Sequence, residues 1–113
     1  MKVPRHELFK LQADICKTLA DPNRLAILHE LRDGEKSVGE IVTALGLRQS
    51  NTSRHLAVMR DRGLVAARRD GTTIYYGLTN EQIGAACDLV QQVLESRLAH
   101  SQELAASLDK LSR

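Results

Sequence analysis

Apolar residues recur every three or four positions along most of the chain, the spacing of helices that bury one face. This pattern predicts a first helix over about residues 6–20. A second helix, NRLAILHELR, is expected after Asp21 and Pro22, which suit an N-cap and a first helical position, and it should end near Gly34. The first helix carries two apolar stripes, so we expect it to be covered on two sides, in part by a partner.

The middle of the chain predicts two short helices joined by a tight turn. Ser37 and Glu40 have the S-x-x-E spacing of a capping box and open a helix, VGEIVTAL, that Gly46 is placed to end. Another helix should follow over about residues 49–62. The pair forms a helix-turn-helix over about residues 37–62, a motif whose second helix enters the major groove of DNA.

Two β-prone runs, LVAARR and TIYYGL, follow the helix-turn-helix and are separated by Asp70 and Gly71, a strong hairpin signal. They predict a wing over about residues 64–78. A last helix, which Thr79 and Gln82 could cap, is expected over about residues 80–112, and its heptad-like apolar positions favour a helical interface. The expected fold class is mainly α with a small β-hairpin wing, a single winged helix-turn-helix domain over residues 1–113.

The second helix of the motif has two unlike faces. Leu56, Met59 and Gly63 fall within about 40° of Thr52 on a helical wheel, so we expect these four residues to be buried. The opposite face is small, polar and cationic, which allows close approach to base edges. Candidate DNA contacts are Gln49, Ser50, Asn51, Ser53, Arg54 and His55 on this helix and Arg68, Arg69, Thr72 and Thr73 on the wing. His55 is interpreted first as a half-buried structural residue and second as a phosphate contact.

The charge is unevenly distributed along the chain. The net charge is only +2, yet residues 48–69 hold six arginines against one aspartate, a net +5. The other residues hold ten Lys or Arg against thirteen Asp or Glu, a net −3. A basic stretch over the helix and wing favours a polyanionic partner, double-stranded DNA, over an ordinary solvated cationic face.

Composition excludes several other classes of protein. No apolar run approaches the roughly 20 residues of a membrane span, and the first ten residues, MKVPRHELFK, contain no signal-peptide core. The two cysteines are far apart, which fits neither a disulfide framework nor a zinc finger. We therefore expect a cytoplasmic protein with reduced thiols. No catalytic constellation or phosphate-binding glycine loop is visible, so neither an enzyme nor a cofactor is expected.

The stretch from ADPNRLAIL to DGTTIYYGL resembles the ArsR/SmtB family of bacterial repressors, over about residues 15–95. The motifs that carry the resemblance are DPNRLAIL, SVGEI, S-x-x-S-R-H-L, GLV and DGTTIYY. The resemblance implies a winged-helix homodimer joined by its first and last helices. It also implies a repressor that leaves its operator when a small inducer binds, often a metal ion, arsenite or a thiol oxidant.

The sensor patterns known in this family are missing. A pattern of two cysteines would need Cys at two positions that here hold Ser37 and Gly39. A zinc pattern would need metal ligands at positions that here hold Asn80, Gln82, Val93 and Ser96. A dithiol pattern would need cysteines at His29 and at about Glu95. Cys87, His100 and Glu103 keep three of the four zinc spacings seven residues later, with Leu89 in place of a histidine. We interpret His100 and Glu103 as solvated side chains and expect no metal site.

Cys16 and Cys87 remain as candidate inducer thiols. Cys16 lies on the second stripe of the first helix and Cys87 on the seam of the last, so both should face the implied dimer interface. Two thiols there could bind arsenite or become oxidised; the plainer interpretation is two small buried hydrophobic residues. The alternatives left open are control by another ligand or a partner protein, and a winged helix used for protein–protein assembly, which would not need the arginines.

Overall fold

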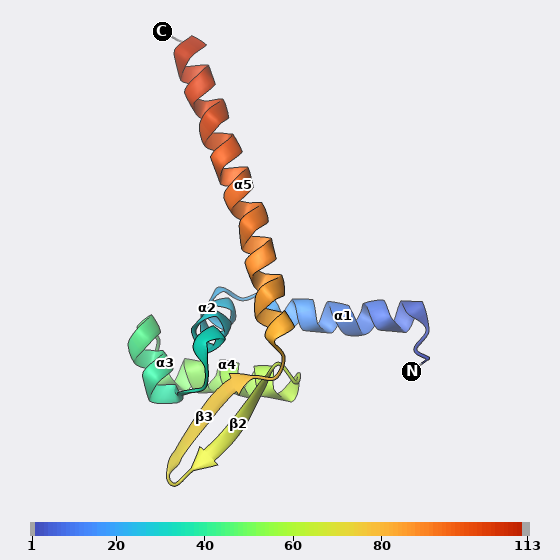
Figure 1. The fold of residues 1–113 in the computed structure, drawn as a ribbon, viewed down its shortest axis with the longest axis vertical. Coiled ribbons are helices and arrows are strands. Elements are labelled where there is room, and N and C mark those ends of the chain that lie inside the picture. Colours follow the sequence, from blue (N-terminus) through green and yellow to red (C-terminus); the bar gives the residue numbers. More distant parts are fainter. Residues whose placement is uncertain (1, 112–113) are drawn as a thin grey trace. The chain divides into compact units, whose positions relative to one another are not determined.

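The computed structural model describes residues 2–111 and confirms a mainly helical chain with a small antiparallel sheet. The elements, shown in Figure 1, are α1 (Arg5–Leu19), α2 (Pro22–Glu30), a short 3₁₀ turn η1 (Leu31–Asp33), β1 (Lys36–Ser37), α3 (Val38–Leu45), α4 (Gln49–Asp61), β2 (Val65–Asp70), β3 (Thr73–Leu78) and α5 (Glu81–Leu111). The chain forms two compact units, the first ending at Glu81 and the second beginning at Gln82. The single domain predicted over residues 1–113 stays a prediction, and the end predicted for the last helix, residue 112, lies outside the described residues.

Local capping signals fix the helices before the wing. Asp21 accepts hydrogen bonds from the backbone N–H groups of Asn23 at 2.9 Å and Arg24 at 3.1 Å, as its N-cap position predicted. Ser37 and Glu40 form both bonds of the capping box, and Gly46 ends α3 in the left-handed conformation. α2 is shorter than predicted because its last turn tightens into η1.

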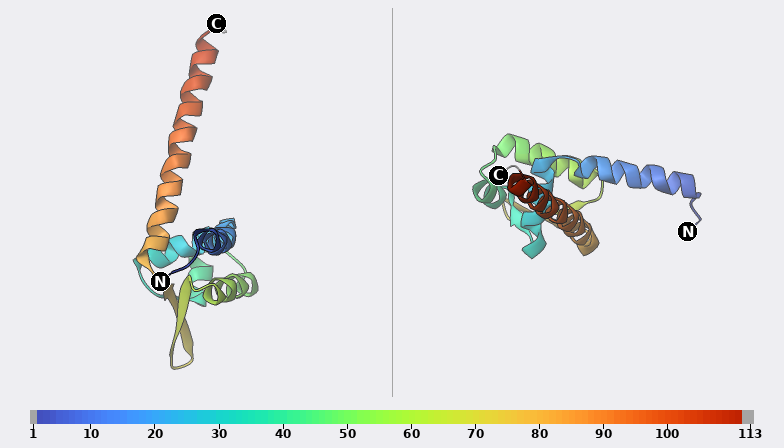
Figure 2. Two further views of the ribbon diagram at one scale, coloured as in Figure 1. Left: turned by 90° about the vertical axis from the view of Figure 1, so that its right-hand side faces the viewer. Right: turned by 90° about the horizontal axis from the view of Figure 1, so that it is seen from above.

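The wing is part of a three-stranded antiparallel sheet in the order β1-β3-β2. β2 and β3 pair from Val65 opposite Leu78 to Asp70 opposite Thr73, which leaves a two-residue turn at Gly71 and Thr72. Gly71 has a φ of +63° and stands first in this turn, not second as the Asp-Gly signal predicted, because Asp70 still pairs with Thr73 in the ladder. In the left view of Figure 2 the hairpin is a thin ribbon that extends beyond the helices of its unit.

The third strand, β1, was not predicted. It has only two residues, Lys36 and Ser37, which pair with Tyr76 and Tyr75. The Thr79 hydroxyl donates to the carbonyl oxygen of Gly63 at 2.6 Å, and the cap predicted for the last helix at Thr79 and Gln82 stays a prediction. This bond joins the end of β3 to the turn after α4.

A compact aliphatic core holds α4 by one face. The buried apolar residues are Ile27, Leu28, Leu31, Ile41, Leu56, Met59, Leu64 and Val65. Thr52 is fully buried beside them, and its hydroxyl donates to the carbonyl oxygen of Arg48 at 2.9 Å. The buried face predicted for this helix is therefore confirmed, except at Gly63, which is exposed at the helix end. The opposite face of α4 is left to solvent.

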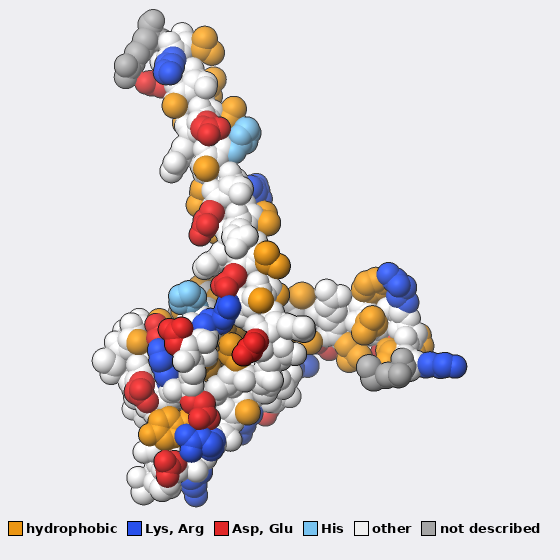
Figure 3. All heavy atoms as spheres, viewed as in Figure 1, with side chains coloured by type: hydrophobic (Ala, Val, Ile, Leu, Met, Phe, Trp, Pro, Cys, Tyr) orange, Lys and Arg blue, Asp and Glu red, His pale blue; other side chains and the backbone are white. Residues whose placement is uncertain are grey.

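Both long helices expose apolar side chains, visible as orange spheres along each helix in Figure 3. α1 exposes Leu8, Phe9, Leu11 and Ile15, and α5 exposes Leu89, Val90, Val93, Leu94, Leu98, Leu104, Leu108 and Leu111. Within α1, Thr18 is the single buried residue. None of the helices described is both long and apolar enough to cross a membrane.

Candidate nucleic-acid interface

The turn between α3 and α4 leaves the start of α4 open. Arg48 is the N-cap of α4, and no side chain of the described residues caps this end. The first N–H groups of a helix have no partner within it, and together with the helix dipole they attract anions such as phosphate. Gln49 and Ser50, in the first turn, are exposed beside these groups.

The exposed face of α4 carries a side-chain pair that the sequence did not predict. Arg54 donates from Nη2 to the Oδ1 atom of Asn51 at 3.1 Å. The contact uses the acceptor oxygen of Asn51 and leaves N–H donors on both side chains. The pair therefore suits acceptors on DNA, such as guanine O6 and N7 or a phosphate oxygen. Ser53 is exposed next to it.

His55 lies on the inner side of α4. Its residue exposure is 9%, and its Nδ1 accepts a hydrogen bond from Nε of Arg24 at 3.1 Å. Its Nε2 is 4.0 Å from a carboxylate oxygen of Asp21. The pKa of Asp21 is held below its usual value, chiefly by the bond from the Arg24 backbone N–H and against the effect of burial. This geometry supports the structural interpretation of His55, and a phosphate contact stays a prediction.

The two arginines of the wing point to opposite faces of the hairpin. Opposite residues in a β-ladder share a face, so Arg68 lies with Tyr75, whereas Arg69 lies with Ile74 on the face that also contains buried Val65. Figure 1 shows the two strands that carry them. Each face of the wing therefore carries one arginine that could contact the DNA backbone.

Arg68 is held in place by two neighbours. Its Nε donates to both carboxylate oxygens of Glu35, at 3.0 and 3.2 Å, and its guanidinium lies over the Tyr75 ring, 5.1 Å from the centroid. The Glu35 side chain packs against Gly77, where an added Cβ would lie 3.1 Å from Cγ of Glu35. Glu35 could not be predicted because it lies 33 positions from Arg68 in the sequence. Tyr75 was missed because its contact with Arg68 depends on the register of the hairpin.

The basic stretch is partly neutralised within the chain. Arg62 lies 4.0 Å from the carboxylate of Asp14, and Arg68 is bonded to Glu35. The other arginines of the stretch are exposed; they are Arg48, Arg54, Arg60 and Arg69. Thr72 is exposed in the turn of the wing and Thr73 is half-buried. The positive charge that DNA could meet is thus distributed along α4 and on one face of the wing.

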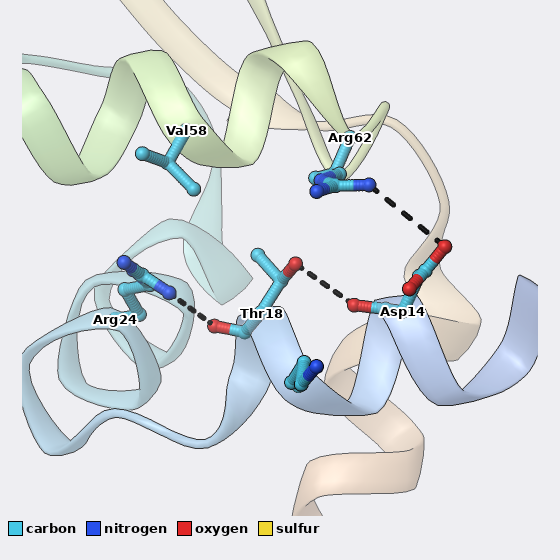
Figure 4. A pocket seen from close by; sticks show the side chains of 6 residues that line it. Asp14, Thr18, Arg24, Val58 and Arg62 are labelled. Atoms are coloured by element: carbon cyan, nitrogen blue, oxygen red, sulfur yellow. Dashed lines mark hydrogen bonds and ion pairs between the residues drawn. The ribbon is translucent and has the colours of Figure 1, made fainter.

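A shallow pocket lies where α1, α2 and α4 meet. It is lined by Asp14, Lys17, Thr18, Arg24, Val58 and Arg62. Figure 4 shows Arg24 donating to the backbone carbonyl of Thr18, and Arg62 facing Asp14. The first contact links the end of α1 to α2, and the second links α1 to the end of α4, within the basic stretch.

The cysteines lie in different units of the chain. Cys16 is exposed on α1 and Cys87 is half-buried on α5. The plainer interpretation makes both cysteines small buried residues. Because Cys16 is exposed in the single chain, it fits that interpretation only if α1 is covered, for example by a second molecule. No group of three or more His, Cys, Asp or Glu side chains is arranged to hold a metal ion within residues 2–111.

Comparison with known proteins gives the same motif and fold. Residues 21–67 match the model of the bacterial regulatory protein family arsR. The chain is 40% identical over 104 residues to Rv0081 of Mycobacterium tuberculosis, an HTH-type transcriptional regulator, covering 88% of this chain and 91% of the relative. It is 39% identical over 79 residues to the transcriptional activator HlyU of Vibrio cholerae, covering 70% of this chain and 73% of HlyU.

Solved structures extend the comparison to the fold. The homodimeric winged helix-turn-helix DNA-binding domain of Mb0332 from Mycobacterium bovis matches with a TM-score of 0.77 and 36% identity, over 88% of this chain and 93% of that domain. The transcriptional repressor BigR of Xylella fastidiosa matches with a TM-score of 0.69 and 32% identity, over 80% and 96%. The match to Rv0081 spans most of both chains at 40% identity. The chain therefore belongs to the arsR family of bacterial regulatory proteins.

Proposed function

We propose that this protein is a homodimeric, sequence-specific DNA-binding repressor that occupies an operator and is released by a small inducer. The observation that carries the proposal is α4: one face is locked into the core, and the opposite face is polar and cationic. Such a helix enters the major groove with its N-terminal residues first. Family membership makes DNA the expected polyanion.

We assign the DNA-contacting residues as follows. Gln49, Ser50, Asn51, Ser53 and Arg54 contact bases or the adjoining phosphates from the start of α4, where the side chains are short enough for close approach. On the wing, Arg69 contacts the DNA directly, and Arg68 does so after it exchanges its bond with Glu35 for a phosphate. Thr72 and Thr73 contribute near the turn. Phosphate contacts fix the register on DNA, and base contacts specify the sequence.

The second copy is proposed to pack on the exposed apolar faces of α1 and α5. Seven of nine heptad-like positions along α5 are apolar if Cys87 is counted, which is the pattern of a helical interface. The positions are Ile83, Cys87, Val90, Leu94, Arg97, Ser101, Leu104, Leu108 and Leu111. A two-fold dimer would present two α4 helices to successive major grooves, about 34 Å apart, and so require a pseudo-palindromic operator. The homodimeric state of the Mb0332 domain supports this arrangement.

The inducer is proposed to be arsenite or another thiol-reactive species acting at Cys16 and Cys87. Their positions on the two proposed dimer helices support this, because a reagent that bridges or modifies the thiols there would change how the two chains pack. Control by another ligand or by a partner protein is the alternative. Protein–protein assembly without DNA is disfavoured by the arginines of the basic stretch. The protein is assigned to the cytoplasm, where its DNA lies.

Two arginine variants test the DNA assignment. Arg54→Ala should lose about 1–3 kcal/mol of affinity for the operator and little for random duplex, the cost of one lost base contact. Arg69→Ala should weaken both duplexes about equally, because it contacts phosphate. Fluorescence anisotropy with both duplexes measures this, and equal losses on both duplexes in both variants would contradict the division of roles.

The regulatory part needs separate measurements. Transcription in vitro from the protein's own upstream promoter should fall when the protein is added; a rise would contradict repression and favour an activator. Arsenite should release the reduced protein from its operator, and Cys16→Ser or Cys87→Ser should abolish the release. Release that persists in both serine variants would assign the inducer site to other residues.

A further inference from the structure

The junction of α1, α2 and α4 is organised around one side chain, Arg24. Its guanidinium donates from Nε to Nδ1 of His55 on α4 at 3.1 Å, and from Nη1 to the carbonyl oxygen of Thr18 on α1 at 3.1 Å. Its own backbone N–H is bonded to the Asp21 cap of α2. One residue therefore joins three helices, including the proposed recognition helix and a proposed dimerisation helix. Figure 4 shows the bond from Arg24 to Thr18.

Both side-chain contacts of Arg24 are made to groups with little freedom. Thr18 is 5% exposed and donates its hydroxyl to the carbonyl oxygen of Asp14, so the last turn of α1 is fixed around it. His55 is 9% exposed and adjoins fully buried Leu56. Because the Nδ1 atom accepts the bond from Arg24, the ring is held with its other nitrogen towards Asp21. Arg24 thus constrains where the middle of α4 lies relative to α1.

We propose that Arg24 is the positioning residue of the recognition helix: it fixes α4 relative to the dimerisation helix α1 and thereby sets sequence-specific DNA affinity. The inference rests on the proposed function. Base contacts require side chains to be placed within a fraction of an ångström, whereas phosphate attraction tolerates displacement. Loss of the Arg24 contacts should therefore lower operator affinity and leave random-duplex affinity almost unchanged.

The planar guanidinium is what the junction requires. Arginine presents donors in a fixed fork, which here reaches two acceptors on different helices, whereas a lysine ammonium is a point charge on a flexible stem. Arg24→Lys keeps the positive charge, so non-specific attraction to DNA is preserved. This exchange separates positioning from charge. A matched control is Arg32→Lys, the same exchange at an exposed position of η1, outside the basic stretch.

The test compares the operator with a random duplex of equal length, by anisotropy, for the parent, Arg24→Lys, His55→Leu and the double variant. We expect Arg24→Lys to weaken operator binding about tenfold or more, as for the loss of one or two hydrogen bonds to a charged group. Random-duplex affinity should change less than about twofold. His55→Leu should act in the same direction, and the double variant should be little worse than either single one.

The melting temperature of each variant is measured in parallel, because a purely structural role of Arg24 would have a different effect on the two affinities. A variant that merely unfolds loses the same fraction of active protein on both duplexes, so the ratio of the two affinities would not move. An unchanged ratio in Arg24→Lys, with or without a lower melting temperature, would overturn the inference. Additive losses in the double variant would also overturn it. A parent protein that binds the two duplexes equally would instead refute the proposed function.

Discussion

The ion pair on the wing provides a prediction with a calculable magnitude. Glu35 neutralises Arg68 locally, through bonds from Arg68 Nε to both carboxylate oxygens. The two side chains are 44% and 54% exposed, so the pair should contribute only about 0–1 kcal/mol to the free energy of unfolding. Glu35→Gln should therefore leave the fold intact while releasing the arginine for a phosphate.

The size of the effect follows from counterion release. One additional phosphate contact in each protomer steepens the plot of log affinity against log salt by about 0.9, or about 1.8 for a dimer. A change from about 200 mM to about 50 mM salt is fourfold, so the advantage of Glu35→Gln over the parent should grow about twelvefold over that interval. The gain should be similar on operator and random duplexes, because a phosphate contact carries no sequence information.

The assay is a set of anisotropy titrations at four salt concentrations. Glu7→Gln is the matched control, because it removes the same charge from another exposed ion pair, Glu7 with Lys10 on α1. The control should keep the slope of the parent. If Glu35→Gln has the slope of the parent, or if Glu7→Gln is equally steep, then Arg68 is not a restrained DNA contact and the interpretation of the wing is refuted.

Three further predictions concern assembly and stability. Leu94→Glu places a charge on an α5 side chain that is 53% exposed in the single chain, so it should yield a folded monomer that has lost operator binding; a folded dimer in sedimentation experiments would contradict the interface. Ser37→Ala removes the capping box of α3 and should lower the free energy of unfolding by about 1 kcal/mol in urea, with an unchanged m-value. The lowered pKa of Asp21 means that its stabilisation is present above the unfolded pKa and is lost as the pH falls through the folded one. Asp21→Asn, which keeps an N-cap acceptor, should therefore flatten the acid limb of the stability curve below about pH 4, and an acid limb identical to that of the parent would contradict this origin.

Signals confined to a few neighbouring residues were predicted correctly from the sequence. The Asp21 cap, the Ser37–Glu40 capping box and the Gly71 turn each depend on residues within four positions of one another. The burial of Thr52, Leu56 and Met59 also follows from helical spacing alone. These features located α4 and the wing, and so most of the candidate interface.

Contacts between distant residues were not predicted. Arg24 meets His55 across 31 positions, and Glu35 meets Arg68 across 33. Neither the spacing of apolar residues nor a sequence motif predicts such pairs, because they form only when the helices and the sheet pack together. As a result Arg68 and Arg69 were predicted as equivalent contacts, although the pleat of β2 directs them to opposite faces. Within residues 2–111, of these two arginines only Arg68 meets a carboxylate. The strand β1 was missed for a related reason, since two residues carry no recognisable pattern.

Recognition of a specific DNA sequence by α4 can be measured in one titration. The reduced protein is titrated, by fluorescence anisotropy, into a duplex from its own upstream region and into a scrambled duplex of the same length and composition. We expect a preference of about a thousandfold or more for the upstream duplex at physiological salt. Equal affinity for the two duplexes would contradict it, because the basic stretch would then serve only to hold DNA of any sequence.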